Sequence, residues 1–397
     1  MAMSINTNVV SINAQRNLSL SGGSLATSMQ RLSSGLRVNS AKDDAAGLAI
    51  AERMSTQVRG LAVASRNAND GISLAQTAEG ALGKVGDMLQ RMRELAVQSG
   101  NATNSKSDRE ALQAELKQLR EEVDRVAKTS SFNGSKLLDG SFTGGVFQVG
   151  ANSGDNITVG ALANTKVTEL GNSRYATADI AAPAVTGAMM TGADVTVSIT
   201  GANGGTAVTA TITKSANEPT AQEALGKVIE AINSKSADTG VTAFLNDAKT
   251  GIDLRGTITS GGTYAAIVVT MSGGTSASIA GVGNATEVTG ATGKGIDKVD
   301  ITTQKGAWEA LQRIDSALDK VSAARAELGA IQTRFEKSIE NIDIMGENIS
   351  AARGRITDAD FAKETANLSR TQILQQAGTA MVAQANQLPQ QVLQLLQ

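Results

Sequence analysis

Apolar residues recur at helical heptad spacing in two stretches of the chain, one in each half. In the first half this spacing is kept by Leu61, Ala68, Ala75, Leu82, Leu89 and Ala96. In the second half it is kept by Leu311, Ile314, Leu318, Val321, Leu328, Phe335, Ile342, Met345, Ile349, Ala352 and Ile356. Such spacing turns one face of a helix toward a partner helix. The two stretches are predicted to pair with each other, with copies of themselves, or with both.

The N-terminal part is predicted to be helical before the first heptad stretch begins. A helix over residues 4–34 carries Ile5, Val9 and Ile12 on one face. We take this face as part of a predicted assembly surface.

Two sequence patterns typical of helix N-terminal capping boxes follow this first helix. Ser40 and Asp43 fit a capping box that opens a long helix, which is expected to end near Gly100. Ser107 and Glu110 fit a second box, which opens a shorter helix.

The C-terminal part shows the same elements in the opposite order. A long helix is predicted over residues 305–353, with an interruption near Gly354 and a capping box of Thr357 and Asp360. The final helix carries a sevenfold stripe that completes the predicted assembly surface: Leu374, Met381, Leu388 and Leu395. The mirrored order predicts an antiparallel coiled-coil rod with both termini side by side at one end.

Between these helical parts the chain is rich in Gly, Ala, Ser and Thr. Alternating residues over 195–200 and 208–213 predict two strands, and residues 202–206 are typical of a hairpin loop. One amphipathic helix is predicted over residues 221–234. The fold class is therefore mainly α at the termini with a β-rich central insert, in an elongated multidomain chain.

The composition excludes most chemistry. Histidine and cysteine are both absent, which removes the commonest general base, the thiol nucleophile and the usual transition-metal ligands. The segment Gly290–Gly295 departs from a phosphate loop, because Gly295 stands where Ser or Thr is required. We therefore expect no enzyme, no cofactor and no metal.

Charge and hydropathy limit the partners in the same way. The net charge is −2 without a basic cluster, which argues against nucleic acid and anionic membranes. No run of 18 apolar residues is present. The N-terminal residues lack a basic head followed by an apolar block, so export without a cleavable signal peptide is expected.

The C-terminal helix has an amphipathic pattern without charge. After Arg370 the sequence holds no ionisable side chain and is rich in Gln, Ala and Leu. A solvated surface helix normally carries Lys and Glu, so a neutral face suits burial among identical helices. This is the strongest sign of polymerisation that the residues themselves provide.

Several motifs resemble those of bacterial flagellin. RLSSGLRVNSAKDDAAGLAIAERM at residues 31–54, SRNANDGISLAQTAEGAL at 65–82 and QRMRELAVQSGNATNS at 90–105 are similar to its N-terminal region. RTQILQQAGTAMVAQANQLPQQVLQLLQ at 370–397 is similar to its tail. Residues 223–246 are similar to a short module that some flagellin-like proteins repeat.

The resemblance implies a filament subunit for swimming motility with three regions. Residues 1–41 and 358–397 would form the inner-tube core, and residues 42–160 with 300–357 the outer-tube helical domain with a β-hairpin region. Residues 161–299 would be a variable insert exposed on the surface. The subunit would leave the cell unfolded through the flagellar type III apparatus and reside in the extracellular filament.

The resemblance also implies partners. They are other copies of the chain, an export chaperone, and the cap and junction proteins of the flagellum. Arg91, Leu95 and Glu115 match family positions contacted by Toll-like receptor 5, whereas Met92 departs from the usual β-branched residue. Recognition by that receptor is therefore expected.

Two other classes compete with the filament subunit. A hook-filament junction protein shares terminal heptads, but its termini diverge from LSSGLRVNSAKDDAAG and ILQQAGTA. A secreted coiled-coil adhesin or receptor ligand would be a soluble monomer or small oligomer instead of an open-ended polymer. The filament subunit is the preferred interpretation.

Overall fold

A computed structural model describes most of the chain, with gaps in the middle part. It describes residues 8–173, 175–180, 190, 193–201, 206–214, 219–246, 248–258, 267–272, 279–281, 286–288 and 295–395. Only the backbone is described at 279–281, 286–288 and 388–395. Ile5, residues 202–205 and residues 290–294 lie outside the described residues, and so do the side chains of Leu388 and Leu395.

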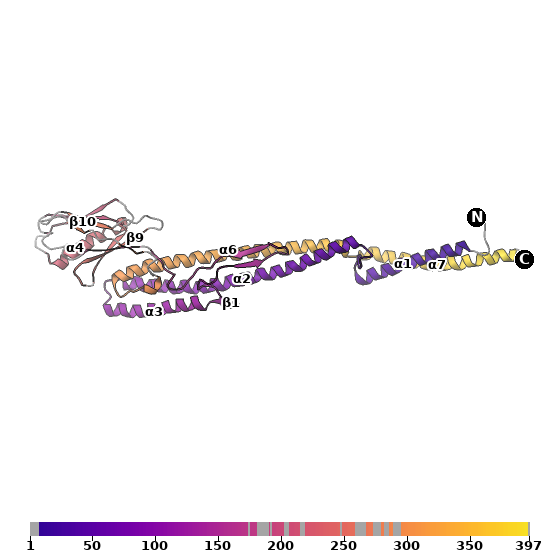
Figure 1. Cartoon of the computed structure of the whole chain (residues 1–397), viewed down its shortest axis with the longest axis horizontal. Helices are drawn as coiled ribbons and strands as arrows, with labels where there is room; N and C mark the ends of the chain where they lie inside the picture. The colour runs from indigo at the N-terminus through magenta and orange to yellow at the C-terminus, as the bar shows by residue number, and fades with distance from the viewer. Residues whose placement is uncertain are drawn as a thin grey trace. The chain divides into compact units, whose positions relative to one another are not determined.

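Long helices form both terminal parts, and strands form the middle, so the predicted fold class is confirmed (Figure 1). The N-terminal helices are α1 (Val9–Ser34), α2 (Ala45–Ser99) and α3 (Lys106–Thr129). The C-terminal helices are α6 (Gln304–Thr357) and α7 (Phe361–Leu395).

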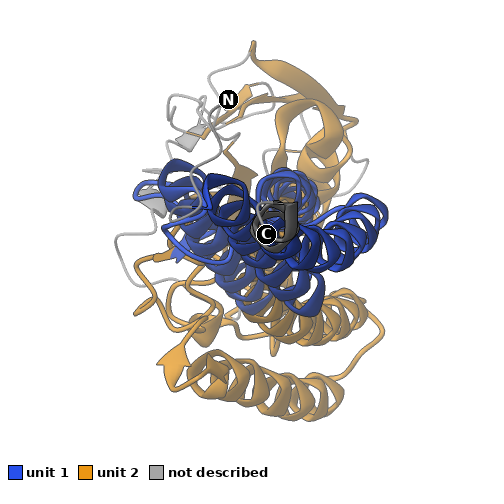
Figure 2. Ribbon diagram, turned by 90° about the vertical axis from the view of Figure 1, so that its right-hand side faces the viewer, with its two compact units in different colours: residues 1–70, 147–157, 334–397 blue, residues 71–146, 158–333 orange. Residues whose placement is uncertain are grey.

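The chain divides into two compact units (Figure 2). Unit 1 comprises residues 1–70, 147–157 and 334–397, and unit 2 comprises residues 71–146 and 158–333. Helices α2 and α6 each contribute one part to unit 1 and another part to unit 2.

In unit 1, residues 147–157 pack against α2 and α6. This segment includes parts of two paired strands, β3 (Gly145–Gln148) and β4 (Asn156–Val159). Phe147 meets Phe335 edge-on at 5.4 Å between ring centroids. An apolar cluster fixes the segment to both helices: Leu61, Ala64, Ile342, Val149, Ala151 and Ile349.

In unit 2, the heptad stripes of α2 and α6 are buried. The buried members in this unit include Ala75, Leu82, Leu89, Ala96, Ile314, Val321 and Leu328. Arg93 Nε donates to Asp315 (2.6 Å), and Gln332 Nε2 donates to Glu79 (2.8 Å), so polar pairs join α2 and α6 beside the stripes. The heptad pattern therefore correctly predicted helix pairing within the chain.

A tight hairpin follows α3. Strands β1 (Ser131–Phe132) and β2 (Ser135–Lys136) are antiparallel. Asn133 and Gly134 both have positive φ, 46° and 82°, as a two-residue hairpin turn of the Asn-Gly type requires.

The β-rich part of unit 2 contains two antiparallel sheets. The first has the order β12 (Thr286–Val288), β5 (Tyr175–Ile180), β9 (Ile252–Thr257), β8 (Val241–Leu245). The second has the order β11 (Ile279–Gly281), β10 (Val268–Ser272), β6 (Val195–Thr200), β7 (Val208–Ile212). The predicted pairing of β6 with β7 is confirmed, with Val195 opposite Ile212.

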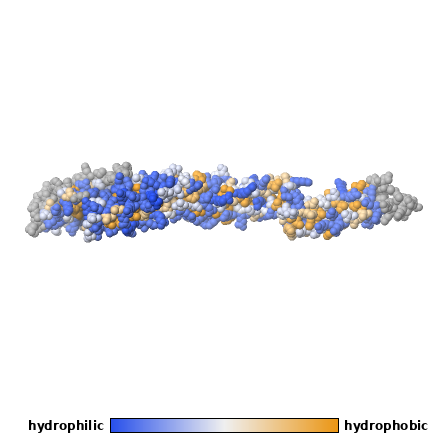
Figure 3. All heavy atoms as spheres, turned by 90° about the horizontal axis from the view of Figure 1, so that it is seen from below, coloured by the Kyte–Doolittle hydropathy of each residue, from blue (hydrophilic) through white to orange (hydrophobic). Residues whose placement is uncertain are grey.

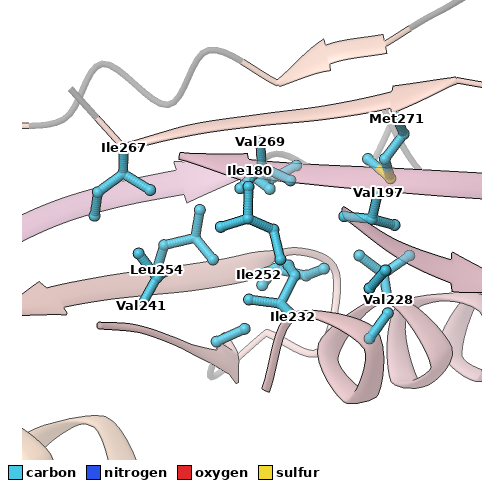
Figure 4. Packing of buried hydrophobic residues seen from close by; sticks show 14 of the residues in the cluster. Ile180, Val197, Val228, Ile232, Val241, Ile252, Leu254, Ile267, Val269 and Met271 are labelled. Carbon is cyan, nitrogen blue, oxygen red and sulfur yellow. The ribbon is translucent and has the colours of Figure 1, made fainter. Parts of the chain in front are cut away.

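One core joins these sheets to α4 (Ala221–Asn233), the helix predicted over residues 221–234. Figure 4 shows Val228 and Ile232 of α4 facing side chains of both sheets, such as Ile252 and Val197. A short helix α5 (Ser236–Thr239) follows α4, and the 3-10 turn η4 (Ile296–Lys298) precedes α6.

Two of the predicted helix starts are wrong by a few residues. Ser105 and Asp108 form the capping box of α3, with Ser105 N donating to Asp108 (2.9 Å), so Ser107 lies inside the helix. Ser40 does hydrogen-bond to Asp43, but this bond closes a turn ahead of α2. Asp44 caps α2 instead, because its Oδ1 accepts from Gly47 N (2.8 Å).

The predicted interruption near Gly354 is present as a break between α6 and α7, but it lies a few residues later, and Thr357 is the last residue of α6 instead of part of a capping box for α7. Helix α6 continues through Gly354 to Thr357, because one glycine lowers helix propensity by about 1 kcal/mol without ending the helix. Asp360 then begins α7, accepting from the backbone N–H groups of Ala362 (3.1 Å) and Lys363 (3.2 Å).

Candidate assembly surface

Helices α1 and α7 pack together in unit 1 through a seam of small and medium side chains. On α1 the residues turned toward the seam are Ser11, Ala14, Leu18, Ser21, Leu25, Ser28 and Leu32. On α7 they include Leu368, Thr371, Gly378, Val382 and Ala385. A Cβ atom at Gly378 would lie 3.1 Å from Leu18 Cδ1, so the helices approach closely at this point.

Polar side chains align the two helices at the start of α1. Asn8 caps α1 by accepting from Ser11 N (3.1 Å), and its Nδ2 donates to the carbonyl of Ala385 (2.8 Å). Ser11 Oγ donates to Asn386 Oδ1 (2.6 Å). These bonds join residues near opposite ends of the chain and set the register of the pair.

The turns at the other end of α1 and α7 are also joined. Gly35 ends α1 with φ +72°, a conformation that glycine adopts without strain. Ala359 N donates to Gly35 O (2.9 Å), and Arg37 N donates to Thr357 O (2.7 Å). The Arg37 guanidinium donates to Ile356 O (2.6 Å), so the pair is fixed at both ends.

The seam leaves the larger apolar residues of both helices outside. Val9 is 64% exposed, Ile12 57%, Leu374 49% and Met381 64%. These are the predicted assembly residues whose side chains the structure describes. We name the exposed set the terminal apolar surface: Val9, Val10, Ile12, Leu20, Met29, Phe361, Ile373, Leu374 and Met381.

The terminal apolar surface has few charged neighbours. Helix α1 carries Arg16 and Arg31, and α7 carries Lys363, Glu364 and Arg370. Glu364 is buried. In Figure 3, hydrophobic residues accordingly reach the surface near the grey terminal atoms. Isolated exposed apolar residues are ordinary in soluble proteins, but several of them on a nearly uncharged helix pair favour an interaction site.

Sequence reasoning missed part of this surface. Val10, Leu20, Phe361 and Ile373 do not follow the predicted stripes, yet they lie outside the seam. The usable signal was the three-four spacing of Ser, Ala and Leu along α1. It identifies the inward face and assigns the bulkier residues to the outside.

The three predicted receptor residues lie in unit 2 and differ in exposure. Arg91 on α2 and Glu115 on α3 are about half exposed, and Arg91 Nε donates to Glu115 Oε1 (2.9 Å). Hydrogen bonds to Glu94 and Glu115 raise the pKa of the Arg91 guanidinium. Leu95 is fully buried, and so is Met92.

A buried polar cluster holds the β-rich part against the start of α6. Glu309 accepts from the Tyr175 hydroxyl (3.0 Å) and from Arg255 Nε (2.8 Å). Arg313 donates to the same hydroxyl (2.9 Å), and Lys305 donates to Asp253 (2.7 Å). Each of these charges has an opposite charge within reach, which is typical of structural ion pairs.

Two kinds of feature are absent among the described residues. Among them, no three acidic side chains gather in a way that would hold a metal ion. Within the same residues, no helix is long and apolar enough to cross a bilayer. A cavity of about 180 Å³ at the start of α6 is lined by Lys298, Lys305, Glu309 and Arg313, whose charges are paired as above or with Asp297.

Comparison with known proteins places both helical parts in one family. The bacterial flagellin N-terminal helical region matches residues 5–143, and the bacterial flagellin C-terminal helical region matches residues 311–396. The B-type flagellin of Pseudomonas aeruginosa is 38% identical, and flagellin C of Vibrio cholerae is 40% identical, each over the full length of both chains. The solved structure of FliC from Burkholderia pseudomallei is 28% identical, covering 66% of this chain and 99% of that one, with a TM-score of 0.38.

Proposed function

Because the chain belongs to the bacterial flagellin family, we propose that it polymerises through its terminal apolar surface. Members of this family are structural subunits of the flagellar filament, and the chain is such a subunit in a motility organelle. The observation that carries the proposal is the set of large apolar side chains left outside the α1–α7 seam. Burying them against further copies of the chain would remove apolar area from water, which stabilises the assembly by about 25 cal/mol for each Å² buried.

Within this proposal, each of three parts of the chain has its own role. Residues 1–41 and 358–397 supply the polymer core, and residues 42–160 with 300–357 surround it. Residues 161–299 lie outside this core. Within this proposal Ile5, Leu388 and Leu395, whose side chains the structure does not describe, stay predicted assembly residues.

Electron microscopy and sedimentation of variant chains test the proposal. Ile12→Lys and Met381→Lys each place a charge on the terminal apolar surface, and we expect neither to form filaments. Leu245→Lys is the matched control, because it replaces an exposed apolar residue of the β-rich part. A chain lacking residues 358–397 is also expected to stay unassembled. Normal filaments from both charged variants would contradict the proposal.

We further propose that Toll-like receptor 5 recognises the surface around Arg91 and Glu115. These two side chains are accessible and form a fixed ion pair between α2 and α3. Leu95 is buried, so we assign it the role of holding Arg91 in position. Arg91→Ala and Glu115→Ala are expected to lower signalling in a receptor reporter assay. Arg125→Ala should not, although it breaks a similar exposed pair with Glu122 on α3.

We also propose export through the flagellar type III apparatus, without a cleavable signal peptide, to the extracellular filament. An export chaperone and the cap and junction proteins are the partners this route requires. The lack of cysteine supports it, because an unfolded chain cannot form stray disulfides in transit. Loss of the export apparatus should keep the chain inside the cell, and its presence in the medium of such cells would contradict the proposal.

A further inference from the structure

Strand β8 is the last strand of its sheet among the described residues, so one side of its backbone has no strand partner there. Its partner β9 lies opposite in antiparallel register, with Ala243 facing Leu254. Gly240 O accepts from Thr257 N (3.0 Å), and Asn246 N donates to Gly251 O (3.0 Å). Backbone N–H and C=O groups alternate in direction along a strand. Those of Val241, Ala243 and Leu245 therefore point away from β9.

The side chain of Asn233 occupies this outer side at the centre of the strand. Its Oδ1 accepts from Ala243 N (2.7 Å), and its Nδ2 donates to Ala243 O (3.0 Å). One amide thus makes both hydrogen bonds that a neighbouring strand would make with Ala243. Thr239 Oγ1 accepts from Val241 N (3.3 Å) on the same side.

The position of Asn233 is set by α4. Asn233 is the last residue of that helix, and Thr220 with Glu223 forms a capping box at its start. Leu225, Val228 and Ile232 anchor α4 in the core between the sheets. The amide is therefore held against the strand by a packed helix.

The residues of β8 make its open edge prone to pairing with another strand. The strand reads Val-Thr-Ala-Phe-Leu and contains no charge, proline or glycine. Such a segment with an open edge is a template for pairing with another strand. Charges and prolines that commonly protect edges are absent here, so the amide performs that task alone at Ala243.

We propose that Asn233 blocks the edge of β8 and prevents it from pairing with β8 of another copy of the chain. The proposal rests on the proposed function only where it invokes crowding, because polymerisation would bring many copies of this edge close together. In the free chain the same block acts against association at high concentration.

The test compares three variants of the full chain with the parent. Asn233→Ala removes the block. Asn246→Ala is the matched control, because it removes an asparagine that accepts from Thr250 N (2.8 Å) in the β8–β9 turn without touching the edge. Asn233→Ala with Leu245→Lys restores protection by placing a charge at the exposed end of β8.

Three measurements on these chains decide the matter. In Asn233→Ala, hydrogen exchange at the Ala243 amide should be about tenfold faster than in the parent. Filaments of this variant should bundle in electron micrographs, and the free chain should self-associate in sedimentation velocity runs. Filaments of Asn246→Ala and of the double variant should remain separate.

Three results would overturn the proposal. They are unchanged exchange at Ala243, dispersed filaments and free chains despite faster exchange, and bundling that Leu245→Lys does not reverse. If the parent itself forms no filaments, the proposed function fails. The edge block is then judged on the sedimentation of the free chains alone.

Discussion

At the scale of single residues, the ion pairs of this chain differ chiefly in burial. Glu309 holds two guanidinium groups, Arg255 and Arg313, that are almost completely buried. Glu309→Gln would remove the negative partner of Arg313 and leave Arg255 with Asp179 at 3.9 Å, so we expect a loss of about 3 kcal/mol in the free energy of unfolding. The single tryptophan, Trp308, packs edge-on against Tyr175 at 6.0 Å and reports the transition by fluorescence in urea.

The control for this prediction is an ion pair that lies in water. Lys337 and Glu340 are both about two-thirds exposed and 2.9 Å apart. Glu340→Gln is expected to cost less than about 0.5 kcal/mol, as exposed pairs do. Equal losses in the free energy of unfolding for Glu309→Gln and Glu340→Gln would show that the cluster around Glu309 does not hold the β-rich part against α6.

The phenol of Tyr175 makes the same cluster sensitive to alkali. Burial, and then the charge of Glu309, raise the pKa of Tyr175 above its usual value of about 10. A raised folded-state pKa favours the neutral phenol in the folded chain. The resulting stability is present below pH of about 10 and is lost as the pH rises through the folded pKa.

The measurement is an ultraviolet titration of a Tyr264→Phe chain, in which Tyr175 is the remaining tyrosine. We expect its phenolate to form at higher pH than free tyrosine, together with a fall in urea stability. Ionisation of Tyr175 at the ordinary pH, with the fold intact, would contradict the assignment.

At the scale of elements, helix starts show where sequence patterns become ambiguous. Ser105 with Asp108 and Ser107 with Glu110 both fit a capping box, and only the structure selects Ser105. Ser105→Ala should therefore lower the free energy of unfolding by about 1 kcal/mol. Ser107→Ala should leave it unchanged or slightly raise it, because alanine favours a helix interior. Urea denaturation of the two variants decides, and the reverse order would contradict the assigned cap.

The elements that were predicted correctly are those with a local cause. The alternation of β6 and β7 and the apolar period of α4 are set by neighbouring residues. The order β12-β5-β9-β8 is different, because β5 pairs with β9 more than seventy residues later in the chain. No local pattern encodes that pairing, nor the position of Asn233 against Ala243.

At the scale of the whole molecule, one sequence pattern has two outcomes. The heptad residues Leu61, Leu82 and Leu89 are buried within the chain, whereas Leu374 and Met381 are exposed. Spacing alone predicts that a helix has a partner but not which chain provides it. The sequence could therefore suggest residues of the candidate surface. Only the structure shows which apolar residues of α1 and α7 are exposed and which lie in the seam between these helices.

This separation predicts how salts act on polymerisation. The terminal apolar surface consists of exposed apolar side chains, and α7 carries no charged residue after Arg370. We therefore expect filament contacts at this surface to be stabilised by the exclusion of water. Sulfate, which strengthens apolar burial, should lower the concentration of free chain left beside filaments. Sodium chloride should change it little, although raising salt from 0.1 to 1 M shortens the Debye length from about 10 to about 3 Å.

Calorimetry provides the matching thermal signature, because burial of apolar area gives a negative heat-capacity change on association. We expect the polymerisation enthalpy to become more favourable with rising temperature in the parent. Ile12→Lys is the control in both experiments, since its added charge should keep the chain unassembled at sulfate concentrations that suffice for the parent. Filaments that dissolve in sodium chloride and show no heat-capacity change would mean that ion pairs hold the copies together, and the terminal apolar surface would then lose its assigned role.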